Sequence, residues 1–96
     1  MKEMEIIGVN ELIDTSLTDV LTERGIVYTC EYLGNVGAIE IVRYSYRSDG
    51  YDRVAYESSG MYDCDSTVSR SIVCPGRLDD ESPMAVYRAI KAASNN

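Results

Sequence analysis

The sequence predicts one α+β domain, in which an antiparallel sheet of three to four strands has an N-terminal and a C-terminal helix packed on one face. Three observations lead to this fold class. Apolar residues recur at helical spacing near the start of the chain, alternate with a period of two through its middle, and return to helical spacing near its end. No repeat or linker interrupts the 96 residues, so residues 1–96 are expected to form a single domain.

The first helix is expected over residues 10–24. Asn10 is a suitable N-cap, and Gly25 can adopt the left-handed conformation that ends a helix. The apolar face of this helix contains Val9, Ile13, Leu17, Val20 and Leu21. The opposite face has no basic residue before Arg24, so its carboxylates form an acidic stripe. The stripe consists of Glu11, Asp14, Asp19 and Glu23.

Alternation of apolar and polar residues then predicts the strands. They are expected at 26–33, 38–47 and 51–58, with a fourth strand in some part of 61–73, best placed at 67–73. Residues 34–37, Ser48-Asp49-Gly50 and Ser59-Gly60 are the expected turns. The second strand has apolar residues on both of its faces, which a twist, a bulge or burial on two sides would explain. Residues 4–7 could add a short edge strand.

A second helix is expected after an acidic loop at residues 78–81. Ser82 is a suitable N-cap and Pro83 suits the first helical position. Val86, Tyr87, Ile90 and Ala93 can pack inward, whereas Arg88 and Lys91 face outward.

The charge balance narrows the classes of partner. The formal net charge is −7, from 16 acidic and 9 basic residues. Direct binding to nucleic acid or to an anionic membrane requires clustered Lys and Arg, so both are disfavoured. A basic protein surface is the natural complement of this chain.

No catalytic signature is present. The chain has no histidine, the commonest general base, and it lacks the GxSxG, Walker and GxGxxG motifs. We therefore expect neither an enzyme nor a cofactor. Cys30, Cys64 and Cys74 are an odd number without a CxxC pair, and we find neither a signal peptide nor a membrane-spanning run. Reduced thiols and a cytoplasmic location are expected, while a bond between Cys64 and Cys74 stays open.

Two further classes share superficial features with this sequence. The residues at 63, 65, 67 and 69 have the spacing of the first ligands of an EF-hand loop. Val68 replaces the required Gly, however, and Cys74 replaces the bidentate Glu, so no metal site is expected. The element order also matches double-stranded RNA-binding domains. The second helix of those domains starts with lysines that bind phosphate, whereas residues 79–81 here are Asp-Asp-Glu.

Residues 44–65 combine five tyrosines with five acids. They have two interpretations. The tyrosines can fill the core and the cross-strand pairs of two hairpin strands. Alternatively, rings and carboxylates form a recognition surface that takes the place of bases and phosphates. In the second interpretation the candidate partner-binding residues, besides the acidic stripe, are Asp49, Tyr51, Asp52, Glu57, Tyr62, Asp63 and Asp65.

In its small size, acidity, lack of a cofactor motif and αβ layout, the chain resembles phage-encoded inhibitors of bacterial defence, above all anti-CRISPR proteins. The resemblance lies in these overall properties of the chain and rests on no sequence motif. It implies a non-enzymatic protein in the bacterial cytoplasm that binds a CRISPR effector or its subunit, and we expect a monomer or a homodimer. Phosphate-like carboxylates would then block the loading of target DNA. The alternative is a small structural or assembly accessory protein that oligomerises through its sheet.

Overall fold

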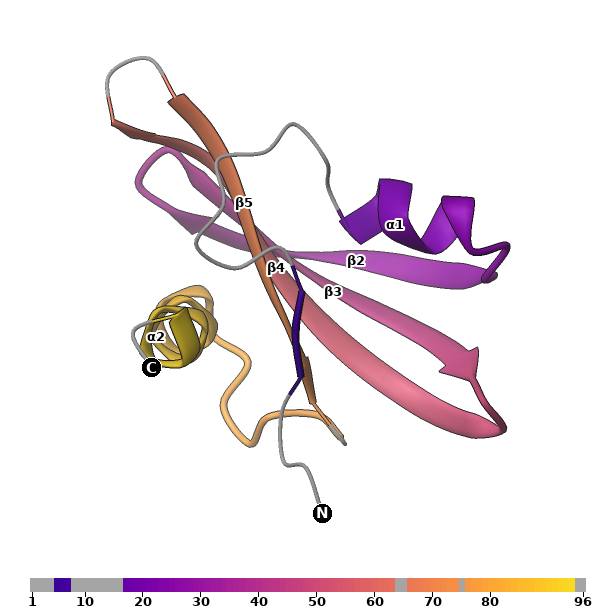
Figure 1. Cartoon of the computed structure of the whole chain (residues 1–96). Coiled ribbons are helices and arrows are strands. Elements are labelled where there is room, and N and C mark those ends of the chain that lie inside the picture. Colours follow the sequence, from indigo (N-terminus) through magenta and orange to yellow (C-terminus); the bar gives the residue numbers. More distant parts are fainter. Residues whose placement is uncertain (1–4, 8–16, 64–65, 75, 95–96) are drawn as a thin grey trace.

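The computed structural model describes residues 5–7, 17–63, 66–74 and 76–94 and has the expected α+β fold (Figure 1). Its elements are β1 (Glu5–Ile7), α1 (Leu17–Glu23), β2 (Tyr28–Val36), β3 (Ile39–Ser48), β4 (Tyr51–Asp63), β5 (Ser66–Cys74) and α2 (Pro83–Ser94). The strands form one antiparallel sheet in the order β1-β5-β4-β3-β2. Four long strands were expected at most, and the short edge strand considered at residues 4–7 is present as β1.

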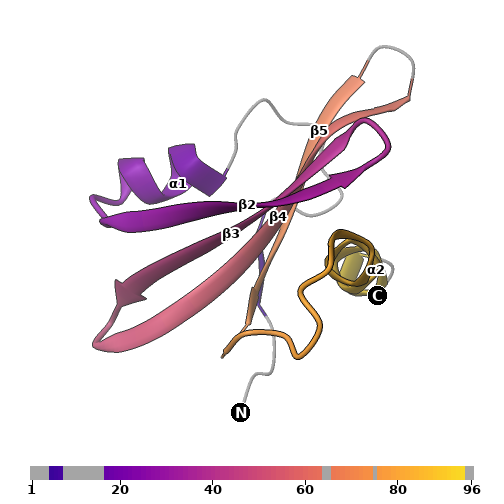
Figure 2. The same cartoon turned by 180° about the vertical axis from the view of Figure 1, so that it is seen from behind.

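The two helices lie on opposite faces of the sheet, which both views show (Figures 1 and 2). The expectation that they share one face was wrong. The reason why the helices lie on opposite faces is visible in β4. Ala55 packs in the core beside α1, and the next residue, Tyr56, packs in the core beside α2. Successive side chains of a strand point to opposite faces, so a strand that is apolar at consecutive positions needs a cover on each side.

Each helix therefore has its own core. The core between α2 and the sheet contains Ile41, Tyr56, Ile72, Cys74, Val86, Ile90 and Ala93. The core between α1 and the sheet contains Leu17, Leu21, Tyr44, Ala55 and Val73. The predicted inward positions of α2 are confirmed, with Tyr87 packed at the margin, and Arg88 and Lys91 are exposed.

The end of α1 is as predicted. Gly25 has φ 71°, its N–H donates to the carbonyl of Thr22 at 3.0 Å, and the N–H of Ile26 donates to the carbonyl of Leu21 at 2.9 Å. This pair of bonds is the Schellman arrangement, which satisfies carbonyls that a helix end otherwise leaves unpaired. The expected start of the helix and its cap, Asn10, lie outside the described residues.

The turn expected at Ser59-Gly60 was wrong, because both residues lie within β4 and pair with Ser69 and Val68 of β5. The other two turns are tighter than the sequence suggested. Asp49 and Gly50 both have positive φ, 55° and 82°, as a two-residue hairpin turn requires. Between β2 and β3 the turn consists of Gly37 and Ala38 alone. Gly34, expected in that turn, instead lies within β2 at a shift of register that follows Tyr32.

Candidate functional site

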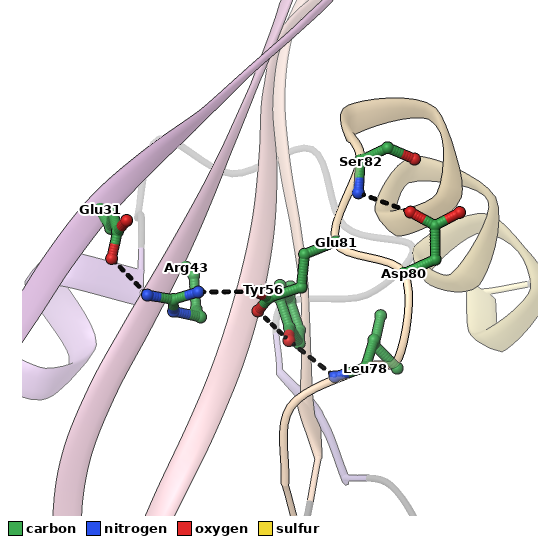
Figure 3. A network of polar contacts seen from close by, with 7 residues as sticks. All are labelled: Glu31, Arg43, Tyr56, Leu78, Asp80, Glu81 and Ser82. Carbon is green, nitrogen blue, oxygen red and sulfur yellow. Dashed lines mark hydrogen bonds and ion pairs between the residues drawn. The ribbon is translucent and has the colours of Figure 1, made fainter.

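A polar network fixes the approach of α2 to the sheet (Figure 3). Glu31, Arg43 and Tyr56 are direct cross-strand neighbours on β2, β3 and β4. The buried guanidinium of Arg43 donates to Glu31 and, at 2.7 Å, to Oε1 of Glu81, which lies just before α2. The hydroxyl of Tyr56 donates to Oε2 of Glu81 at 2.6 Å and accepts the N–H of Leu78 at 2.9 Å. One chain of contacts thus connects three strands with the segment that leads into α2.

Electrostatics keep this network in one protonation state near neutral pH. The hydrogen bond to Glu81 raises the pKa of Arg43. Burial would raise the pKa of Glu81, but hydrogen bonds from Tyr56 and Arg43 outweigh burial and lower it. Burial, with the bond to Glu81, raises the pKa of Tyr56 to about 12. None of the three groups is poised to exchange a proton at neutral pH, so the network suits fixation of a helix rather than acid–base catalysis.

A second cluster attaches α1 to the other face. Glu57 is 3% exposed, and its Oε2 accepts the N–H of Leu17, the first residue of α1, at 2.5 Å. Its Oε1 accepts the hydroxyl of Tyr44 at 3.1 Å, and that hydroxyl lies 2.6 Å from Oγ1 of Thr18. Burial raises the pKa of Glu57, against the opposing effect of its hydrogen bonds. The inclusion of Glu57 in a partner-binding surface was therefore wrong, because strand alternation turns this carboxylate beneath α1.

The tip of the β3–β4 hairpin carries three of the predicted residues. Tyr51 is 69% exposed, and Asp49 and Asp52 are also exposed. Nη1 of Arg47 lies 2.9 Å from Oδ1 of Asp52, and Nη2 of Arg53 lies 4.0 Å from Oδ2 of Asp49. Each acid thus has an arginine beside it, so the tip is locally balanced in charge and is a weak mimic of phosphate.

The outer side of α1 carries the remaining predicted acids that the structure describes. Asp19 and Glu23 are exposed and stand four residues apart, so they lie on one face of the helix. Buried Leu17 and Leu21 hold the opposite face against the sheet. Tyr62 and Asp63 belong to β4, but their side chains fall outside the described part, as do Glu11, Asp14 and Asp65 entirely. Of the predicted residues that the structure describes, Asp19 and Glu23 lie together on α1. Asp49 and Asp52 lie on a different element, the β3–β4 hairpin.

Sequence reasoning missed the Arg43–Glu81–Tyr56 network. One signal for it was present, because Arg43 continues the alternating series Ile39, Ile41 and so occupies a position that faces the α2-side core. It also missed the exposed edge of β2, where Tyr32 is 60% exposed.

The described part of the chain has neither a cluster of metal ligands nor a membrane-spanning helix. Across residues 5–7, 17–63, 66–74 and 76–94, no three Cys, Asp or Glu side chains gather as potential metal ligands. In that same part, neither helix has the length and apolarity needed to cross a bilayer. Comparison of the chain with protein-family models, with curated proteins and with solved structures found no match.

Proposed function

We propose that this protein is a non-enzymatic acidic binding protein that covers a basic nucleic-acid-binding surface of a partner protein, in the manner of anti-CRISPR inhibitors. The observation that carries the proposal is the net charge of −7 together with exposed acids on the outer face of α1. The partner is a CRISPR effector or one of its subunits in the bacterial cytoplasm.

The outer face of α1 is the first candidate for the contact. Asp19 and Glu23 are separated by about 6 Å along the helix axis, which follows from a rise of about 1.5 Å per residue. Their orientation is fixed, because Leu17 and Leu21 are 1% and 2% exposed against the sheet. The hairpin tip is the second candidate, and its acids are already paired with Arg47 and Arg53.

Inhibition in this proposal is steric and electrostatic. Carboxylates on a rigid helix attract the basic groove, and the bulk of the domain excludes the nucleic acid. Long-range attraction between exposed charges is screened by salt, so the affinity for the partner falls as the ionic strength rises.

The test measures displacement of labelled target DNA from purified CRISPR effectors as the protein is titrated, at low and at high salt. Two double variants each remove two negative charges: Asp19→Asn/Glu23→Gln on α1 and Asp49→Asn/Asp52→Asn on the hairpin. We expect the α1 variant to inhibit about tenfold less well, a loss of about 1.4 kcal/mol, and the hairpin variant to inhibit almost as the native protein does. Equal losses would assign the effect to net charge alone, and failure of the native protein to displace DNA from any effector would contradict the proposed function.

A further inference from the structure

The free edge of β2 is a second surface that can bind a partner, because its backbone groups can pair with another β-strand. This strand is the last of the sheet, with β3 on one side and no described strand on the other. Two of the large apolar residues that are most exposed, Val27 at 89% and Tyr32 at 60%, lie at this edge. The geometry points to a second copy of this chain as its partner: two β2 strands pair antiparallel, with Cys30 on the two-fold axis, and the two sheets become one.

The hydrogen-bond pattern of the sheet decides which β2 residues direct their backbone groups outward. Ser48 and Tyr51 close the two-residue turn between β3 and β4, and such a closing pair exchanges backbone hydrogen bonds. Bonded and non-bonded pairs alternate, so even-numbered β3 residues bond to β4 and odd-numbered ones bond to β2. The β2 residues opposite those odd positions are Thr29 and Glu31. The N–H and C=O groups that point away from the sheet therefore belong to Tyr28, Cys30 and Tyr32.

The register follows from which side chains would meet. With Cys30 on the axis, Tyr28 faces Tyr32 of the second copy twice by symmetry, and Thr29 faces Glu31. Cross-strand aromatic pairs stabilise antiparallel strands, whereas like charges directly opposite destabilise them. An axis at Glu31 would oppose two carboxylates. An axis at Thr29 would set Glu31 against Val27 and leave both tyrosines without an aromatic neighbour across the new pairing.

The local sequence leaves this edge open to pairing. Edge strands are commonly protected by lysine, proline or a bulge. Residues 28–32 contain neither lysine nor proline, and their one charged side chain, Glu31, is held by Arg43. The shift of register comes only after Tyr32, so it limits the pairing to these five positions rather than preventing it. The dimer does not depend on the proposed binding to a basic partner protein, and its test requires no other protein.

Sedimentation equilibrium over a range of protein concentrations tests the dimer. Five paired residues bury little surface, so the dimer should be weak and its population should rise with protein concentration. Tyr32→Lys introduces a charge at the edge of β2. Tyr51→Lys makes the same change at a tyrosine of the hairpin tip that is 69% exposed, against 60% for Tyr32, and serves as the matched control. We expect the native chain and Tyr51→Lys to dimerise, and Tyr32→Lys to raise the dimer Kd at least about tenfold. A monomeric native chain, or a dimer unaffected by Tyr32→Lys, would overturn the inference.

A thiol cross-link tests the register in chains that carry Cys64→Ser; the third thiol, Cys74, is 3% exposed. A short bis-maleimide should join two copies through Cys30. A matched chain with Cys30→Ser and Val27→Cys keeps the Tyr28–Tyr32 pairs and separates the two thiols by six residues along the strands, about 20 Å. We expect this second chain to cross-link at least about tenfold more slowly. Comparable rates in the two chains would exclude Cys30 from the axis.

Discussion

Two buried ionisable side chains determine where the helices attach. Glu57 accepts the first backbone N–H of α1, and Arg43 binds Glu81 just before α2. The partners are 40 and 38 residues apart in the chain. Sequence periodicity cannot reveal such pairs, because it records which face a residue occupies and not which distant group will meet it. This is why Glu57 was expected at the surface and why the role of Arg43 was missed.

Glu57 should make stability depend on pH. Burial raises its folded pKa above the unfolded value. The folded state therefore binds more protons than the unfolded state while the pH lies between the two values, so the free energy of unfolding falls as the pH rises through that window. Glu57→Gln keeps an acceptor for Leu17 and removes the charge. We expect urea unfolding of this variant, measured from about pH 4 to pH 8, to show a smaller loss of stability with rising pH than the native protein does.

Glu57→Ala is the control for that measurement. It leaves the buried N–H of Leu17 without its acceptor, so the free energy of unfolding should fall by about 1–3 kcal/mol at the acidic end of the range, where the native protein has its full stability from Glu57. An unchanged pH dependence in Glu57→Gln would show that other carboxylates cause it. Glu81 is distinguishable, because its pKa is lowered and its contribution to stability is lost as the pH falls.

The elements themselves were largely predictable, because their signals are local. Gly25, Asp49-Gly50 and Ser82-Pro83 mark ends and turns by backbone chemistry that needs no distant partner. Gly34 shows the limit of such signals. It was expected in a turn, but it lies within β2, where a positive φ of 141° and the close approach of Pro83 at the start of α2 favour glycine.

Gly34→Ala should weaken the contact between β2 and α2. Gly34 has φ 141°, and a Cβ at this position would lie 2.5 Å from Cγ of Pro83. We expect the free energy of unfolding to fall by about 1–3 kcal/mol, from backbone strain and from the clash together. Thermal unfolding measures the sum, and a double-mutant cycle separates its parts. In a Pro83→Ala background the clash is relieved, so Gly34→Ala should cost about 1 kcal/mol less there. Equal costs in both backgrounds would leave only the backbone strain.

The molecule as a whole is one sheet with a separate core on each face. The fold class followed from the order of the periodicities, but the placement of the helices did not. Apolar residues on both faces of the strand at 38–47 were compatible with a twist, a bulge or burial on two sides, and only the packed structure distinguishes these. The two cores share strands but have no residue in common.

Substitutions in the two cores should therefore add. Ile90→Val lies in the α2-side core and should cost about 1 kcal/mol, and Val73→Ala lies in the α1-side core and should cost about 2 kcal/mol. Sites without shared partners add to within about 0.5 kcal/mol, so the double variant should lose close to the sum. Ile90→Val with Ile72→Val, both in the α2-side core, is the matched pair for which coupling is expected.

Urea unfolding should still show one transition in every variant, because loss of either helix exposes strands against which the other helix also packs. Two separate transitions would mean that one helix with its face of the sheet unfolds alone.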